Sequence, residues 1–114
     1  MKRFNKIKPV ARTPGAMNKT EAAYAAILEL RKRAGEIREY KYESVTFKLA
    51  PDTRYTPDFY VVFEDRIELH EVKGGLVRED AWIKFKLAVA MFPEYGWKFC
   101  QYKNKATGWN IKEF

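Results

Sequence analysis

The chain has 114 residues, of which 46% are hydrophobic and 16% aromatic, so it is long and apolar enough to fold as one domain around a real core. Lys and Arg outnumber Asp and Glu by 22 to 15, and the pI near 9.5 suits a polyanionic partner. The single cysteine, Cys100, excludes an internal disulfide and a thiolate zinc cluster, and no apolar run is long enough to cross a membrane. No charged-then-apolar leader is present at the amino terminus, so we expect a cytoplasmic protein.

The sequence predicts an amino-terminal arm over residues 1–17 and a single domain over residues 18–114. The arm has five basic residues, no acidic residue and no sustained periodicity, so we expect it to be flexible. It could contact phosphate groups, or it could serve only as a solubilising tail.

A first helix is predicted from Asn18 to Gly35. Asn18 is a good N-cap, Glu21 follows three residues later as a capping box requires, and Gly35 is a helix stop. Capping alone explains Glu21. The same residue also lies on the line of Leu28, at the edge of the apolar stripe, where its carboxylate could face the following strands.

Residues 36–49 are predicted to form one long strand or two broken strands. Pro51 and Asp52 then break the pattern and leave a short loop through Arg54. Arg54 could touch a phosphate, because it lies just upstream of the next strand, or it could simply be a solvated loop residue.

Residues 55–63 and 66–73 are predicted to form an antiparallel hairpin with a two-residue turn at Glu64 and Asp65. In the second strand, the period of two places Glu71 and Lys73 at the end of an otherwise apolar face. Charged groups in core positions are costly unless they are paired or bind a metal. Asp58, at the start of the first strand, can supply a second carboxylate. Such oxygen ligands suit a hard divalent cation, whereas the alternative interpretation is a surface salt bridge on the hairpin.

A second helix is predicted over residues 79–92, and two further strands over residues 97–102 and 109–114 with a turn between them. Apolar residues on two flanks of the helix indicate that both flanks are covered. Lys84 and Lys86 project on nearly opposite sides, so at most one of them can face the hairpin, and we choose Lys84. His70 lies on the strand face opposite Glu71 and is expected to be a surface or packed residue, and Cys100 a core residue.

The pair Pro57-Asp58 on one strand, with Glu71-Val72-Lys73 on the next, resembles the signature of the PD-(D/E)XK nuclease superfamily. The order and spacing over about residues 18–103 are similar to those of small phage-encoded endonucleases of the junction-resolving type. The resemblance implies an α/β fold with a restriction-endonuclease-like αβββαβ core, in which a mixed central sheet is flanked by two helices.

The same resemblance implies a magnesium-dependent DNA endonuclease, with manganese as a substitute metal, acting in phage DNA metabolism in the host cytoplasm. Asp58, Glu71 and the carbonyl of Val72 would bind the metal, and Lys73 would assist the attacking water. Glu21 would complete the catalytic set. Contacts to nucleic acid are expected from Lys19, Arg54, Lys84 and Lys86. Coordinated cutting of two strands would require a homodimer. The alternatives are a nuclease acting on RNA or single strands, and a nucleic-acid-binding module that does not cleave.

Overall fold

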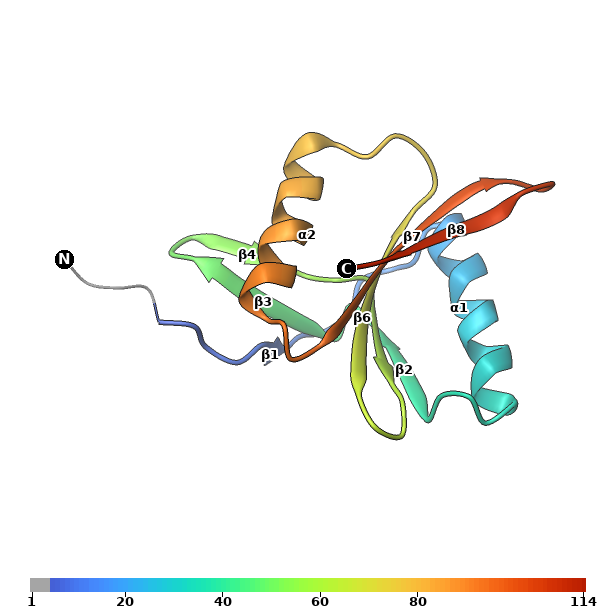
Figure 1. The fold of residues 1–114 in the computed structure, drawn as a ribbon, viewed down its shortest axis with the longest axis horizontal. Coiled ribbons are helices and arrows are strands. Elements are labelled where there is room, and N and C mark those ends of the chain that lie inside the picture. The colour runs from blue at the N-terminus through green and yellow to red at the C-terminus, as the bar shows by residue number, and fades with distance from the viewer. Residues whose placement is uncertain (1–4) are drawn as a thin grey trace.

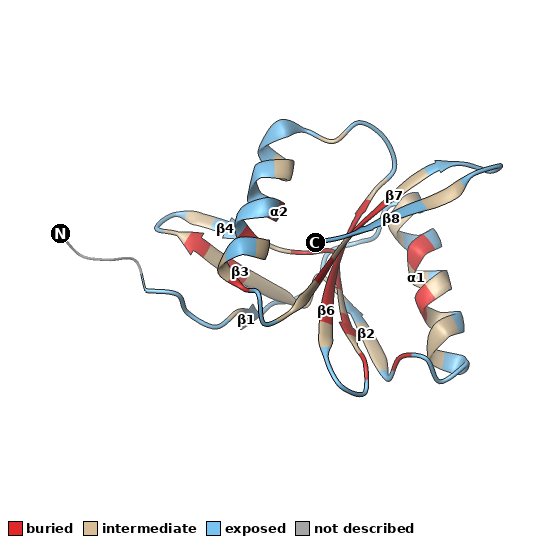
Figure 2. Ribbon diagram, viewed as in Figure 1, coloured by how far each residue is buried: buried red, intermediate tan, exposed pale blue. Residues whose placement is uncertain are grey.

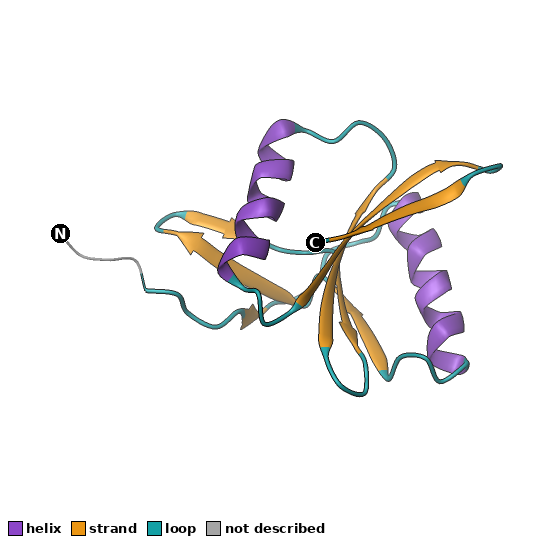
Figure 3. Cartoon of the chain, viewed as in Figure 1, coloured by secondary structure: helices purple, strands orange, loops and turns teal. Residues whose placement is uncertain are grey.

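The computed structural model describes residues 5–114 and contains two helices and two β-sheets (Figures 1 and 3). In chain order the elements are β1 (Val10–Ala11), α1 (Lys19–Arg33), β2 (Glu39–Tyr42), β3 (Val45–Ala50), β4 (Thr53–Tyr55), β5 (Phe59–Val62), β6 (Ile67–Lys73), α2 (Glu79–Met91), β7 (Gly96–Asn104) and β8 (Gly108–Glu113). The larger sheet has the strand order β2-β5-β6-β7-β8, and in it only β6 and β7 are parallel. The smaller, antiparallel sheet has the order β1-β3-β4. The expected α/β class is therefore confirmed.

Helix α1 begins and ends where its sequence signals predict. The side chain of Asn18 accepts a hydrogen bond from the main-chain N–H of Glu21, and the Glu21 carboxylate accepts one from the N–H of Asn18. At the other end, Gly35 has φ +80° and its N–H donates to the carbonyl of Lys32. A positive φ here closes the helix without the steric cost that a side chain would add.

The two helices cover opposite faces of the five-stranded sheet, and each builds its own core (Figures 1 and 2). The core on the α1 side consists of Tyr24, Leu28, Ile37, Phe59, Val61, Phe63, Val72 and Cys100. The core on the α2 side also uses the small sheet and consists of Phe47, Leu49, Tyr55, Leu69, Phe85, Ala88, Phe92, Trp97 and Phe99. Neither helix is long and apolar enough to span a membrane. The sheet is thus buried on both sides between two apolar layers.

The central hairpin has the predicted register. Phe59 pairs with His70, and the N–H of Phe63 donates to the carbonyl of Arg66, which leaves a two-residue turn between them. Leu69 belongs to the core on the α2 side and Val72 to the core on the α1 side, so the predicted alternation along β6 is confirmed. The first strand begins at Phe59, later than expected, because the chain changes from one sheet to the other just before it.

The segment expected as one long or two broken strands forms two strands that belong to different sheets. Glu43, with φ 44°, lies between β2 and β3 and redirects the chain. Asp52, with φ 63°, then makes the turn between β3 and β4. The loop expected through Arg54 is wrong, because Arg54 lies in β4, paired with Lys48.

Helix α2 is covered on one side only, so the expectation that both flanks are covered is wrong. Phe85 and Ala88 are fully buried, whereas the side chains of Ile83 and Leu87 are 54% and 40% exposed. Figure 2 shows the outward side of α2 as exposed. The sheets cover the inner side, and no other described element packs on the outer side.

Residues 5–17 of the expected arm lie along the domain, while Met1–Phe4 fall outside the described residues. Val10 and Ala11 form β1, which pairs with β3. Farther out, Lys6 Nζ lies 2.8 Å from a carboxylate oxygen of Glu94, just after α2. Residues 10 and 11 therefore belong to the folded domain, whose boundary was expected at residue 18.

Candidate active site

Three strand ends meet at one edge of the five-stranded sheet. Because β2 and β6 both run antiparallel to β5, the end of β2 at Tyr42, the start of β5 at Phe59 and the last part of β6 lie side by side. The amino-terminal turn of α1 adjoins the same edge, and the Tyr42 hydroxyl donates a 2.8 Å hydrogen bond to Glu21 Oε1. The capping carboxylate of Glu21 therefore also faces the sheet, which the sequence left as an alternative.

Asp58 lies immediately before β5 and is only 6% exposed. Its Oδ2 accepts a 2.8 Å hydrogen bond from the main-chain N–H of Val72 in β6. In a strand, the N–H and C=O of one residue point to the same side, so the carbonyl of Val72 is also directed towards this edge. The geometry places a carboxylate and a main-chain oxygen side by side.

Glu71 is likewise buried, with 6% exposure, and lies on the α2 face of β6. Its Oε1 accepts a 2.6 Å hydrogen bond from the hydroxyl of Tyr55, and its Oε2 lies 3.2 Å from Lys73 Nζ. The Lys73 side chain is 31% exposed. The pair is therefore not a solvated surface salt bridge, because its carboxylate is enclosed and oriented by a buried tyrosine.

A further carboxylate, that of Glu43, reaches the same edge. One oxygen from each of Glu21, Glu43 and Asp58 lies within 4.8 Å of the others. The N–H of Glu43 donates a 2.7 Å hydrogen bond to the carbonyl of Asp58, which fixes its main chain. Its Oε1 accepts hydrogen bonds from Arg12 and from the N–H of Gly15 in the arm. The sequence did not single out Glu43, because no strand or helix period marks a turn residue with positive φ.

The site has an excess of buried negative charge. Burial and the neighbouring carboxylate of Glu71 hold the pKa of Asp58 well above its usual range, and the Glu21 side chain acts in the same direction. Burial also raises the pKa of Glu71, against the opposing effects of Lys73 and Tyr55. Burial would lower the pKa of Lys73, but the charge of Glu71 outweighs it and the net shift is upward. One lysine thus faces several carboxylates.

Gly74 allows the chain after β6 to pass close to α1. A Cβ atom at this position would lie 2.5 Å from the hydroxyl oxygen of Thr20, whereas a Cβ at Gly75 would meet nothing within 4 Å. The close approach that the two glycines predicted is therefore to the first turn of α1, at Gly74 alone. It sets the distance between this turn, which carries Glu21, and the end of β6.

The basic residues expected to contact nucleic acid are all exposed: Lys19, Arg54, Lys84 and Lys86. None of them makes a hydrogen bond or ion pair with Asp58, Glu71 or Lys73 in the described part of the chain. The two α2 lysines project in different directions, and Lys86 Nζ lies 5.7 Å from the centre of the Trp82 ring. The four residues surround the site at the surface without forming part of it.

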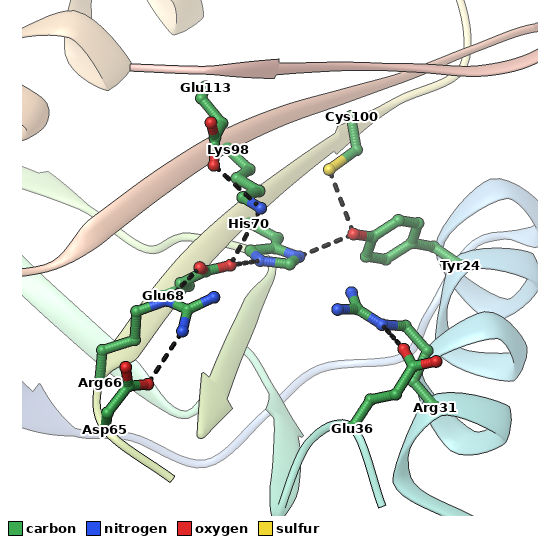
Figure 4. Close-up of polar contacts among 10 residues, drawn as sticks. All are labelled: Tyr24, Arg31, Glu36, Asp65, Arg66, Glu68, His70, Lys98, Cys100 and Glu113. Atoms are coloured by element: carbon green, nitrogen blue, oxygen red, sulfur yellow. Dashed lines mark hydrogen bonds and ion pairs between the residues drawn. The ribbon is translucent and has the colours of Figure 1, made fainter. Parts of the chain in front are cut away.

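A chain of buried polar groups crosses the sheet beside the site (Figure 4). Cys100 Sγ donates to the Tyr24 hydroxyl at 3.3 Å, this hydroxyl lies 2.7 Å from His70 Nδ1, and His70 Nε2 lies 2.9 Å from Glu68 Oε1. The carboxylate of Glu68 can only accept, so Nε2 carries the proton and Nδ1 accepts from Tyr24. Every member of the chain is then satisfied. His70 and Cys100 are confirmed as packed residues, each fully buried.

Glu68 is the charged end of this chain and is 3% exposed. Burial by itself raises the pKa of Glu68, but hydrogen bonds from His70 and Arg66 and the charge of Lys98 outweigh it and lower the pKa to about 2. The pKa of His70 is lowered, chiefly by burial. An ionised glutamate beside a neutral histidine therefore lies within the fold, on the α1 face of β6.

Comparison with known protein families, with curated proteins and with solved structures found no match to this chain. The function must therefore be inferred from the residues of the site. They form an acidic, oxygen-rich site beside a single lysine at the edge of a mixed sheet.

Proposed function

We propose that the protein is a metal-dependent DNA endonuclease of the PD-(D/E)XK type. The observation that carries the proposal is the convergence of buried carboxylates from three chain segments, among them Asp58 and Glu71, next to Lys73. Buried like charges destabilise a fold unless a proton or a cation compensates them, and such sites are typically functional. The paired residues are those of the signature that the sequence resembles.

The order of elements supports the same proposal. Helix α1 is followed by the antiparallel strands β2, β5 and β6, and then by α2 and by β7, which is parallel to β6. This order corresponds to the αβββαβ core that the resemblance implies. The small sheet would then be an insertion between β2 and β5, and β8 an added edge strand.

The donor set fits magnesium. Asp58, Glu71 and the carbonyl of Val72 offer hard oxygen ligands, and Glu21 and Glu43 add carboxylates within reach. The nearby thiol and imidazole, of Cys100 and His70, are engaged in the buried polar chain. Asp58, Glu71 and Val72 would hold the ion, which would supply polarisation of a phosphoryl oxygen and neutralisation of its charge.

The protein's own side chains then have separate roles. Lys73 Nζ, held 3.2 Å from Glu71, would position the attacking water and favour its loss of a proton. The Tyr55 hydroxyl fixes the orientation of Glu71, and the N–H of Val72 fixes that of Asp58. Glu21 is held by its capping bond and by Tyr42, and it would orient groups on the α1 side. The net charge of +7 favours approach to DNA.

We propose that the working unit on DNA is a homodimer, because one chain carries one such site and coordinated cutting of two strands needs two. β8 is an edge strand, and its side is where Ile111 and Phe114 are 49% and 42% exposed. Trp109, another residue considered from the sequence, packs on Tyr24 with ring centres 5.1 Å apart. Light scattering of the free and DNA-bound protein tests the proposal, and a strictly monomeric complex would count against it.

The direct test is incubation of supercoiled, linear and branched DNA with the protein in magnesium, in manganese and in chelator. We expect metal-dependent cleavage that Glu71→Gln and Lys73→Met abolish, while Glu64→Gln, at the other end of the same hairpin, retains it. RNA and single-stranded DNA are included as competing substrates. Binding without cleavage in every metal would instead identify a non-cleaving nucleic-acid-binding module.

A further inference from the structure

A pocket of about 430 Å³ lies between the start of α2 and the β7–β8 hairpin. Its aromatic lining comes from Trp82 of α2 and Phe99 of β7, whose rings meet edge to face with centres 5.0 Å apart. Its polar lining includes Gln101, Asn110 and Lys112. An aromatic wall beside amide and ammonium groups is a combination that recognises a planar, hydrogen-bonding ligand.

The strand register places this pocket on the same face of the sheet as Glu71 and Lys73. In β6 and β7, Glu71 pairs with Phe99 and Lys73 with Gln101. In β7 and β8, Gln101 pairs in turn with Asn110. Paired residues project to the same side, and neighbouring strands are about 4.8 Å apart, so the pocket floor begins roughly 5 Å and ends roughly 10 Å from the candidate active site. That distance corresponds to about one or two nucleotides of an extended strand.

We infer that this pocket binds an unpaired nucleobase of the DNA strand whose phosphate lies at the Glu71–Lys73 edge. The inference rests on the proposed function, because it places a phosphodiester at that edge. Trp82 and Phe99 provide the surface against which a base can pack, and every base has a face suited to such contact. A base in this pocket must be unpaired, because a base pair does not fit between α2 and the hairpin.

Two polar groups suit such a base and its backbone. The side chain of Asn110 makes no hydrogen bond to any described residue, so its carboxamide can both donate to and accept from a base edge. Gln101, by contrast, is fixed by donating to the carbonyl of Gly75 at 2.9 Å. Lys112 places an ammonium group at the pocket for the adjoining phosphate. The carboxylate of Glu79, which also lines the pocket, can accept from the amino group of a base and disfavours an anionic ligand.

The test measures binding, in chelator, of a DNA hairpin with a short single-stranded extension in which one nucleotide at a time is made abasic. We expect the abasic residue to weaken binding about 5- to 100-fold at one position of the extension and little elsewhere, because base stacking contributes about 1–3 kcal/mol. The double variant Asn110→Ala, Lys112→Ala should lose this position dependence. Lys105→Ala, at the tip of the same hairpin, is the matched control and should keep it. Trp82 itself is left unchanged because it also packs against Phe85 and Phe114.

Equal affinity for intact and abasic extensions at every position would overturn the inference, and so would an unchanged profile in the double variant. Cleavage of supercoiled DNA in magnesium is measured separately with the same proteins. Position-dependent binding without any cleavage would leave the base pocket standing and remove the nuclease proposal. Cleavage that Glu71→Gln abolishes, together with a flat abasic profile, would do the reverse.

Discussion

Asp58 Oδ2 accepts a 2.8 Å hydrogen bond from the main-chain N–H of Val72, and this bond joins the two halves of the acidic motif. The main-chain pairing of β5 with β6 extends only to Phe59 and His70, so the side chain of Asp58 continues it one step further. The spacing between Asp58 and Glu71 is therefore set by the sheet itself. An aspartate that satisfies a strand N–H while facing other carboxylates has both a structural role and a cost.

Asp58→Asn should separate these two effects. The amide oxygen can still accept from Val72, but the buried charge beside Glu71 is removed, so we expect loss of cleavage and a gain in stability without metal. Relief equal to a single pKa unit is about 1.4 kcal/mol, or a rise in Tm of roughly 4 °C or more. Thermal unfolding in chelator measures it, with Glu64→Gln as control. Magnesium should raise the Tm of the wild type only. A lower Tm for Asp58→Asn would contradict the proposed charge excess.

Gly74→Ala should disturb the site through α1. The new Cβ would lie 2.5 Å from Thr20 Oγ1 and would push away the turn that carries Glu21. A displacement near 1 Å can reduce a rate about 100-fold, so we expect a large loss of cleavage with a smaller loss of stability. Gly75→Ala meets nothing within 4 Å and should be neutral. Adding Thr20→Ala to Gly74→Ala should restore part of the activity, and failure of this rescue would show that the clash is not the cause.

Tyr55→Phe removes the 2.6 Å hydrogen bond to Glu71 while keeping the ring in the core. We expect cleavage to fall about tenfold, because the carboxylate loses the group that orients it, and stability to fall by about 1–2 kcal/mol. The matched control is Tyr40→Phe, which removes a 2.9 Å hydrogen bond to Glu29 at a distance from the site. Cleavage kinetics at saturating magnesium compare the two. Equal effects of both variants would show that Tyr55 does not act on the site.

Glu68 should give the fold a measurable sensitivity to acid. Its folded pKa of about 2 lies below the ordinary 4.5, so the ionised carboxylate stabilises the fold above about pH 4.5, and this contribution is lost as the pH falls towards 2. Glu68→Gln should lower the free energy of unfolding by about 2–3 kcal/mol at neutral pH and flatten its dependence on pH below about 5. Denaturant unfolding at several pH values measures this. Glu113→Gln, which alters an exposed partner of Lys98, should change neither quantity appreciably.

Neutralising the basic residues of the arm tests whether it contacts phosphate. Lys6→Gln, Lys8→Gln and Arg12→Gln together should weaken DNA binding and reduce the salt slope by up to about 3, since each lost phosphate contact releases about 0.9 fewer counterions. The two ion pairs that these changes remove are exposed, so the Tm should fall only slightly. An unchanged salt slope would identify the arm as a solubilising tail. Deletion of residues 1–17 would also remove β1 and should cost more stability.

Much of the fold could be predicted from local signals. The capping box of α1, the turn at Gly35 and the alternation along β6 each depend on a few neighbouring residues, and each is confirmed. The separation of β3 and β4 into a second sheet was not predictable in the same way. It depends on positive φ values at Glu43 and Asp52, which ordinary residues seldom adopt and which no periodic pattern marks.

The same limit applies to the site. Asp58, Glu71 and Lys73 were identified because their charges interrupt an apolar pattern, and the structure brings them together. Glu43 was missed because it lies in a turn, where a glutamate looks like any solvated residue. Tyr55 was read only as the start of a strand, because its hydrogen bond to Glu71 depends on how two sheets meet. Long-range contacts of this kind leave no local trace in the sequence.

The buried thiol of Cys100 has a practical consequence for studying assembly. It is the only cysteine of the chain, it is fully buried, and burial raises its pKa to about 12. Thiol-directed dyes react with the exposed thiolate, so Cys100 should remain unlabelled at neutral pH without being replaced. A cysteine introduced at the fully exposed Leu76 would then carry a single fluorophore per copy. Energy transfer between donor- and acceptor-labelled copies could report directly on how many of them meet on one DNA molecule.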